Sequence, residues 1–219
     1  MITLESVTNN QQTQVFMKLA DENLGVLGYT EHGVRHGRLT AKRAYEILIK
    51  LGYDPKTCEL AGIAGYLHDI GNSINRSAHE QNSAFLSYHI LKESGADYRE
   101  IGLVIGAIGN HDENEGEPIS PISAAVIIAD KSDVHLSRVR NPREIDFDIH
   151  DRVNYAAKKS IVIVNRPDKT ITLDLSIDTR VSNVMEYFTI FLKRMIACQK
   201  AARLLKCEFK FSINRTKFL

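Results

Sequence analysis

The segment DPKTCELAGIAGYLHDIG, residues 54–71, carries the strongest structural signal in this 219-residue sequence. Its first residue, Asp54, can cap a helix, and the proline that follows suits a first helical turn. Apolar side chains then recur at helical spacing, at Cys58, Leu60, Ile63, Ala64 and Leu67. We therefore predict a helix that brings the adjacent His68 and Asp69 to its C-terminal end, where Gly71 stops it.

Helical patterns extend on both sides of this segment, up to about residue 158. Further helices are expected over residues 36–51, 77–92, 97–109 and 148–158. The helices that start at Ser77 and Asp97 each have a glutamate three residues later, which is the spacing of a capping box. Another helix is expected to start at Ser120, just before a proline, and to carry Asp130 near its middle.

The hydrophobic period changes from helical to alternating after about residue 160. The expected elements are a hairpin of strands 161–164 and 170–177, a long helix over 179–206, and a third strand over 207–213. The apolar positions of the long helix include Leu192 and Ile196. We expect a mainly α protein in two parts: a helical-bundle domain, residues 1–158, and a small α+β appendage of hairpin, helix and strand, residues 159–219.

Charge and composition exclude several classes of protein. The chain has 28 Lys+Arg and 27 Asp+Glu, a net charge of +1, so no field of a single sign favours nucleic acid or a membrane surface. Its content of 43% hydrophobic and 25% charged residues is that of an ordinary globular protein. The longest apolar runs, such as residues 124–129, are far shorter than the roughly 18 residues that cross a bilayer.

The termini and the cysteines give two further expectations. Residues 1–14 are polar and do not resemble a signal peptide, so we expect a cytoplasmic protein. The three cysteines, Cys58, Cys198 and Cys207, lack CxxC spacing, which favours neither a disulfide framework nor a thiolate zinc site.

Candidate metal ligands come from three separate helices: His36, His68, Asp69 and Asp130. Divalent first-row metals accept imidazole nitrogen and carboxylate oxygen, and a mixed set leaves coordination positions open for water and substrate. Such an ion lowers the pKa of bound water and neutralises charge on an attacked phosphoryl oxygen. The residue types therefore favour metal-dependent hydrolysis. The alternative is a buried network of His and Asp without a metal.

The order of these residues resembles that of the HD superfamily of metal-dependent phosphohydrolases. His36 is followed by a helix, His68 and Asp69 stand in the sequence LHDIG, and Asp130 stands in the sequence ADK. The resemblance covers about residues 30–140. It implies a helical domain in which one metal ion has four ligands: His36, His68, Asp69 and Asp130.

The same resemblance implies a second metal ion in some members. His79 and His111 match two further histidines of those members, although Asn110 replaces the first histidine of a pair. Asp69 would bridge two ions through its two oxygens. The expected cofactor is one or two divalent ions, with Mn, Fe, Co, Ni, Mg and Zn all compatible with these ligands. His32 is a weaker further position, available if the helix begins early.

Four basic residues near the candidate ligands could bind substrate phosphates: Arg35, Arg76, Lys131 and Arg138. Lys131 and Arg76 are favoured, because each stands close in sequence to a candidate ligand. The alternative for each is an ordinary solvated or paired cation. Asp133, one helical turn after Asp130, could orient a ligand. The candidate catalytic residues are therefore His68, Asp69, Lys131 and Arg76.

Three functions are open on this evidence. The leading one is a phosphohydrolase that cleaves a phosphomonoester or phosphodiester of a nucleotide with metal-activated water. Some HD proteins resemble mixed-valent di-iron oxygenases with the same ligand pattern, and a non-catalytic metal- or nucleotide-binding module is the third. The expected partner is a small phosphorylated substrate. No membrane partner is expected, nucleic acid is disfavoured, and a homodimer is compatible with the sequence.

Overall fold

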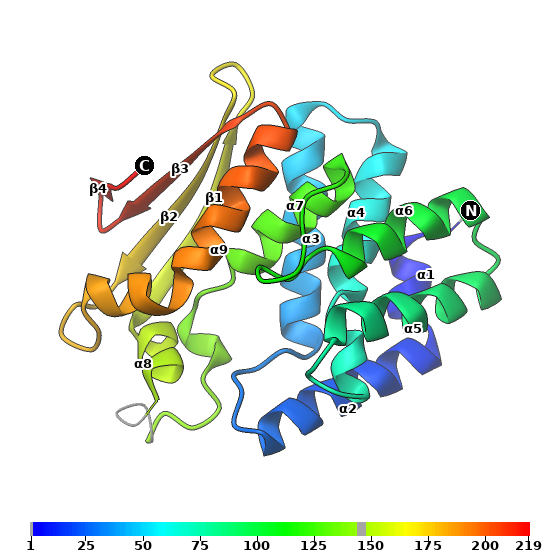
Figure 1. The fold of residues 1–219 in the computed structure, drawn as a ribbon, viewed down its shortest axis with the longest axis horizontal. Helices are drawn as coiled ribbons and strands as arrows, with labels where there is room; N and C mark the ends of the chain where they lie inside the picture. Colours follow the sequence, from blue (N-terminus) through cyan, green and yellow to red (C-terminus); the bar gives the residue numbers. More distant parts are fainter. Residues whose placement is uncertain (1, 144–147) are drawn as a thin grey trace.

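Helices α3 (Val34–Leu51) and α4 (Pro55–Leu67) lie side by side at the centre of the helical part of the chain (Figure 1). The computed structural model describes residues 2–143 and 148–219. Around the central pair lie α1 (Leu4–Thr8), α2 (Gln11–Val26), α5 (His79–Glu93), α6 (Tyr98–Gly109) and α7 (Pro121–Lys131), whereas α8 (Ile149–Ala156) lies beside the C-terminal part of the chain. The mainly helical fold predicted from the sequence is confirmed.

Residues 52–54 end one helix and begin the next, and Asp54 caps α4 as predicted. The Asp54 carboxylate accepts a hydrogen bond from the Thr57 backbone N–H at 3.0 Å and so caps α4. Gly52 ends α3 with a φ of 89°, a left-handed conformation that glycine adopts without strain. All the predicted apolar positions of α4 are buried. They hold the C-terminal end of α4, and with it His68, inside the core.

Gly71 has a different role from the helix stop predicted for it. The chain continues past it as a short 3-10 helix, η1 (Ile70–Ser73). A Cβ added at Gly71 would lie 2.3 Å from the backbone nitrogen of Ser83 and 2.4 Å from the carbonyl oxygen of His79, both in α5. Glycine is required here because α5 packs directly against the backbone that follows Asp69.

The capping boxes predicted at Ser77 and Asp97 do not form. No side chain caps the start of α5, and the carboxylate of Glu80 contacts Nδ1 of His79 at 3.0 Å instead. At α6, Asp97 caps the first turn, but Glu100 forms an ion pair with a lysine of α4. In both helices a side-chain partner takes the glutamate away from the backbone N–H group that a box would use.

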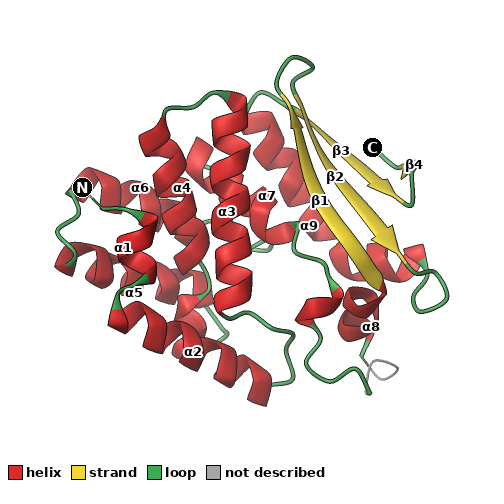
Figure 2. Cartoon of the chain, turned by 180° about the vertical axis from the view of Figure 1, so that it is seen from behind, coloured by secondary structure: helices red, strands yellow, loops and turns green. Residues whose placement is uncertain are grey.

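The C-terminal part of the described chain forms a sheet with the strand order β1-β2-β3-β4. Its strands are β1 (Ala157–Asn165), β2 (Thr170–Ile177), β3 (Glu208–Ile213) and the short, unpredicted β4 (Thr216–Lys217). β1 and β2 form the predicted antiparallel hairpin, whereas β3 lies parallel to β2 after helix α9 (Val184–Leu204). One face of the sheet packs on α9, which also packs on α7 (Figure 1). Figure 2 shows β1 as the strand nearest to α3.

Helix α9 begins later, and buries a different stripe, than the sequence predicts. Asn183 caps it in a capping box with Glu186, so residues 179–183 precede the helix. Leu192 and Ile196, two of the apolar positions that predicted this helix, are 53% and 45% exposed. The largest buried side chains are those of Tyr187, Phe191, Met195 and Cys198. Helix α9 packs on the sheet with one side and on α7 with another. The residues that it buries are therefore those that face these two neighbours.

Helix α7 starts at the predicted Ser120 cap and is buried from Ile122 to Lys131. It ends at Lys131, so Asp130 lies in its last turn and not near its middle, as the sequence analysis expected. The helix can end here because the carbonyl group of Ser132 accepts a hydrogen bond from the hydroxyl group of Ser160 in β1. The sheet therefore contributes to fixing the place of Asp130.

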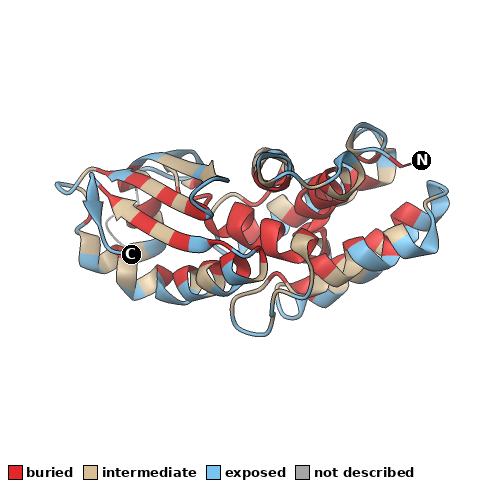
Figure 3. Ribbon diagram, turned by 90° about the horizontal axis from the view of Figure 1, so that it is seen from above, coloured by how far each residue is buried: buried red, intermediate tan, exposed pale blue. Residues whose placement is uncertain are grey.

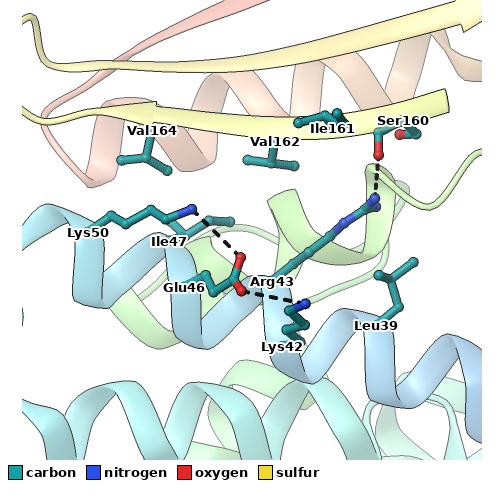
Figure 4. A pocket seen from close by; sticks show the side chains of 10 residues that line it. All are labelled: Leu39, Lys42, Arg43, Glu46, Ile47, Lys50, Ser160, Ile161, Val162 and Val164. Carbon is teal, nitrogen blue, oxygen red and sulfur yellow. Dashed lines mark hydrogen bonds and ion pairs between the residues drawn. The ribbon is translucent and has the colours of Figure 1, made fainter.

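The seam between α3 and β1 joins the helices to the sheet (Figure 4). Arg43 spans this seam and donates a hydrogen bond to the carbonyl oxygen of Ser160 at 2.6 Å. A small cleft of about 200 Å³ lies along it, lined by apolar side chains of β1 and by Lys42 and Lys50, which both contact Glu46. None of the residues that line this cleft is a candidate metal ligand.

The hydrophobic core runs from the helices into the sheet, with buried residues on both sides of this seam (Figure 3). β1 begins at Ala157, so the domain boundary expected after residue 158 falls inside a strand. The three cysteines are buried and free. In the described part of the chain, every helix is too short or too polar to cross a membrane.

Candidate metal centre

Three helices converge on one buried point between α3, α4 and α7. His36 lies in the first turn of α3, His68 and Asp69 follow the last turn of α4, and Asp130 is the last residue but one of α7. All four side chains are buried. The structure therefore brings together residues that are up to 94 positions apart, from 36 to 130.

The first set of ligand atoms consists of His36, His68 and Asp130 together with Oδ2 of Asp69. The Nε2 atoms of His36 and His68 lie 3.1 Å apart. Nε2 of His36 lies 3.2 Å from Oδ1 of Asp130, and Nε2 of His68 lies 3.3 Å from Oδ2 of Asp69. These separations are those of neighbouring ligands around one metal ion, since metal–ligand bonds of about 2.0–2.2 Å meet at roughly 90–110°.

The second set consists of His79, at the start of α5, and His111, just after α6, together with Oδ1 of Asp69. The Nε2 atoms of the two histidines lie 3.2 Å apart. Oδ1 of Asp69 lies 3.5 Å from Nε2 of His79 and 3.9 Å from Nε2 of His111. His68 is also close to this set, since ligand atoms of His68, Asp69 and His111 lie within 4.8 Å of one another. Asp69 thus presents one oxygen to each set.

The donor and acceptor chemistry of the centre fits a cation. Nδ1 of His68 lies 2.8 Å from the carbonyl oxygen of Gly65, and Nδ1 of His111 lies 2.6 Å from that of Ile108. A carbonyl group can only accept, so each Nδ1 carries the hydrogen, and each ring in its neutral form directs a lone pair from Nε2 toward the centre. Carboxylate oxygens also only accept. Atoms with lone pairs face one another, and a positive ion between them satisfies all of them.

His36 is oriented by a buried carboxylate. Its Nδ1 lies 2.7 Å from Oδ2 of Asp133, which also accepts a hydrogen bond from Arg35 at 2.8 Å. Burial raises the pKa of Asp133, but hydrogen bonding to His36 and the charge of Arg138 outweigh burial and hold that pKa well below its usual range. Asp133 therefore stays ionised and fixes the ring of His36, in the orienting position expected from the sequence.

Without a metal ion, the pKa values of His68 in the first set and His111 in the second set shift in opposite directions. Burial lowers the pKa of His68, but the charges of Asp69 and Asp130 outweigh burial and raise that pKa to about 10. His111 has the opposite balance, because burial and the charges of His68 and His79 lower its pKa to about 3. When no metal ion is bound, protonated His68 therefore supplies the positive charge beside the carboxylates of Asp69 and Asp130.

Asn72 is a site residue that the sequence analysis did not identify. Its Nδ2 donates to Oδ1 of Asp69 at 3.0 Å and to the carbonyl oxygen of Asp69 at 2.9 Å. It therefore fixes the rotation of the carboxylate that both sets share. No sequence signal separates this asparagine from an ordinary turn residue, since its role depends on the η1 turn that follows Asp69.

Two weaker sequence candidates lie outside both sets. The side chain of Asn110 donates to the carbonyl oxygen of Gly106 at 3.0 Å and so completes the end of α6. His32 precedes α3, which begins at Val34, so the early helix start that would align it does not occur. Its Nδ1 lies 2.6 Å from the carbonyl oxygen of Thr30.

Lys131 supports Asp130 through a buried chain of ion pairs. Its Nζ lies 2.8 Å from Oδ2 of Asp130 and 2.5 Å from Oε2 of Glu113. Glu113 in turn contacts Nε of Arg194 in α9 at 3.2 Å. Burial raises the pKa of Glu113, but the charge of Lys131 outweighs it and lowers that pKa to about 2. The appendage therefore reaches a candidate metal ligand through two further side chains.

The four basic candidates from the sequence have different surroundings. Arg35 and Arg138 contact Asp133, and Lys131 contacts two carboxylates, so these three cations hold neighbouring side chains. Arg76 is half-buried and lines a polar cleft that reaches His79. It is the basic candidate best placed to contact a substrate.

A helical bundle that gathers imidazole and carboxylate groups from separated helices around a buried centre is characteristic of divalent-metal proteins. Residues 33–135 match the HD domain family, and all six candidate ligands lie within this range. The chain is also 31% identical to an uncharacterized protein of Methanocaldococcus jannaschii, over 78% of this chain and 74% of that relative. The chain therefore belongs to the HD domain family. Members of this family bind divalent metals and are generally metal-dependent hydrolases.

Proposed function

We propose that this protein is a phosphohydrolase that uses one or two divalent ions to cleave a phosphomonoester or phosphodiester of a small metabolite such as a nucleotide. The single observation that carries the proposal is the arrangement around Asp69. Its two oxygens face two adjacent sets of histidine lone pairs, 3.3 Å from His68 on one side and 3.5 Å from His79 on the other. Two neighbouring cations held by one carboxylate suit the attacking and leaving oxygens of a phosphoryl transfer.

The buried carboxylates of the site would accept a phosphate substrate only when cations are bound beside them. Asp69, Asp130 and Asp133 are buried together, and their pKa values lie well below the usual range although burial opposes this. Three carboxylates would repel a phosphate dianion. Bound divalent ions would reverse this charge, lower the pKa of a water molecule and withdraw electron density from phosphorus.

The protein side chains would hold the reacting groups in place. Asp69, fixed by Asn72, would orient the water for in-line attack on phosphorus, while His68 and His36 keep their rings in position through Nδ1 contacts. Arg76, which lines the adjoining cleft, would contact a part of the substrate beyond the reacting phosphate. Hydrolysis joins the water oxygen to phosphorus, breaks the bond to the ester oxygen and leaves a proton on the departing alcohol.

The test combines metal analysis with a substrate screen. The purified protein is analysed for its elements and then assayed against phosphomonoesters and phosphodiesters with Mn²⁺, Fe²⁺, Co²⁺, Ni²⁺, Mg²⁺ and Zn²⁺ in turn. We expect metal-dependent release of phosphate or of an alcohol from at least one nucleotide. A His150→Ala variant is the matched control for His68→Ala, because His150 is exposed and lies outside both sets.

Three results would contradict the proposal. The first is full activity in the His68→Ala variant, which would place the chemistry elsewhere. The second is oxygen consumption by the iron-loaded protein without any phosphate release, which would favour the oxygenase chemistry that the same ligands allow. A metal-loaded protein that turns over none of these compounds would favour a binding module.

A further inference from the structure

A polar cleft of about 650 Å³ opens directly onto the second set of ligands. His79 forms part of its wall, together with the loop before α5, the loop after α6 and helix α9. The described residues that line this cleft include no Phe, Tyr, Leu, Ile or Val. Walls of this kind suit a charged, hydrated group better than an apolar ring.

Most basic side chains close to the metal centre already have carboxylate partners. Arg35 and Arg138 contact Asp133, whereas Lys131 and Arg194 contact Glu113. These cations are neutralised and fixed by their partners, so each has little attraction left for a ligand. Their role is to hold neighbouring side chains.

Arg76 and Lys193 differ from this group, and both line the cleft. Within residues 2–143 and 148–219, each contacts neutral groups and no ion pair joins it to a carboxylate. Nη1 of Arg76 donates to Oδ1 of Asn72 at 3.4 Å, and its guanidinium group lies 5.4 Å from the centre of the Tyr29 ring. Nζ of Lys193 donates to Oδ1 of Asn114 at 3.0 Å. Two unneutralised cations thus border one cleft, one from the loop before α5 and one from α9.

Carboxylates in the cleft limit the size of its occupant. Glu80 contacts Nδ1 of His79, and Asp112 accepts a hydrogen bond from the Asn114 backbone N–H at 2.9 Å. Glu115 also lines the cleft and is exposed. These negative charges oppose the entry of a long polyphosphate or a nucleic-acid strand. A single compact anionic group between the two cations avoids most of this repulsion.

We propose that Arg76 and Lys193 form an anion subsite that binds a second anionic group of the substrate, separate from the phosphate that is cleaved. The proposal rests on the proposed phosphohydrolase function and narrows its substrate class to small molecules with two separated anionic groups, the second a phosphate or a carboxylate. It also gives the appendage a binding role, since Lys193 belongs to α9. Asn114 positions this lysine, because the same amide group donates to Asp112 at 3.2 Å.

Alkylene diphosphonates with one to four carbon atoms between their phosphorus atoms test this subsite, because no ester bond in them can be hydrolysed. Their binding to the full chain saturated with Mn²⁺ is measured by calorimetry and compared with that of methylphosphonate, which has one anionic group. We expect at least one diphosphonate to bind more tightly than methylphosphonate. Lys193→Ala and Arg76→Ala should each weaken diphosphonate binding about tenfold or more and leave methylphosphonate binding within about twofold.

The controls separate the subsite from the metal centre. Lys200→Ala removes a cation from the same helix that is already paired with Glu117 and is outside the cleft, so both affinities should stay unchanged. Lys193→Arg should restore most of the diphosphonate affinity, and Lys193→Glu should lower it further than alanine does. The Mn²⁺ content of every variant should equal that of the original protein.

Two results would overturn the subsite: no diphosphonate binds better than methylphosphonate, or Lys193→Ala leaves the diphosphonate affinity unchanged. These measurements do not depend on turnover. A protein that hydrolyses no phosphate ester, but loses diphosphonate affinity in the Lys193→Ala variant, would retain the subsite and lose only the proposed catalytic function. A carboxylate as the second group is tested in the same way with phosphonocarboxylates of matching length.

Discussion

The two sets of candidate ligands share Asp69, but the residues that orient their histidines lie at different distances along the sequence. In the first set, Nδ1 of His68 has a local contact with the carbonyl oxygen of Gly65, but Nδ1 of His36 contacts Asp133, which is 97 residues away. In the second set, Nδ1 of His111 contacts the carbonyl oxygen of Ile108, three residues away, and Nδ1 of His79 contacts the adjacent Glu80. The first set therefore depends on how the helices pack, whereas the second depends mainly on how two helix ends are shaped.

This difference implies an order of affinity. The first set is enclosed by α3, α4 and α7, and two of its ligands have charged partners: His36 contacts Asp133, and Asp130 contacts Lys131, which also pairs with Glu113. The second set adjoins the polar cleft. Partners that fix ligand orientation raise metal affinity. We therefore expect the first set to hold the tighter ion and the second set to hold an ion that exchanges more readily.

The largest effect is expected at the residue that the two sets share. Asp69→Ala should remove both ions and lower kcat/KM at least about a thousandfold, or about 4 kcal/mol of transition-state stabilisation, because neither set is complete without its oxygen. Elemental analysis and steady-state kinetics measure this, and circular dichroism should show unchanged helix content. Retention of a full complement of metal would contradict the shared role of Asp69.

A smaller and unequal effect is expected when one set is damaged alone. His111→Ala should leave one tightly bound ion per chain and lower activity about a hundredfold, whereas His36→Ala should remove the tighter ion and lower activity further. Titration with a metal-sensitive dye gives the number and affinity of the ions in each variant. Equal losses of metal in the two variants would remove the distinction between the sets.

The supporting residues should have effects that are smaller again. Asp133→Asn should lower the affinity for the first ion about tenfold to a hundredfold, because it removes the charge that orients His36. Glu80→Gln is the matched change beside His79 and should weaken only the second ion, by a few-fold. Competition with a chelator compares the two variants, and the reverse order of effects would show that the second set has the stronger support.

The pH dependence of metal binding should also separate the two sets. With a pKa of about 10, His68 carries a proton at neutral pH in the metal-free protein, and an ion must displace it. Affinity for the first ion should thus rise about tenfold per pH unit between pH 6 and 8 and fall as the pH falls. His111, with a pKa of about 3, is already neutral and releases no proton. Calorimetry in buffers of different ionisation enthalpy counts the released protons, and equal proton release for both ions would contradict this assignment.

The fold class and the candidate ligands were within reach of the sequence. The caps at Asp54 and Ser120 are local signals, and the structure contains both. His36, His68 and Asp130 could be singled out because their residue types and order resemble a known family, and the structure brings them together. The caps depend on residues that are close in sequence, and the candidate ligands were recognised from the order of residues in a known family.

The remaining features depend on contacts between distant segments, which periodicity does not contain. Lys193 contacts Asn114 across 79 residues, and Arg194 contacts Glu113 across 81. Glu80 was expected to complete a capping box, but it lies beside the ring of His79 instead. Each of these contacts forms only where the helices pack against one another. Sequence patterns within a single helix therefore cannot predict it.

Gly71 has a consequence for the spacing of the two proposed ions. The backbone at Gly71 packs closely on the first turns of α5, which carry His79, and a Cβ there would lie 2.4 Å from the carbonyl oxygen of His79. Any larger residue would act as a wedge: α5 would move outward with His79, while His68 and Asp69 would stay with α4. The missing side chain at Gly71 thus helps to set how far His79 lies from Asp69, and a single added methyl group would enlarge that separation.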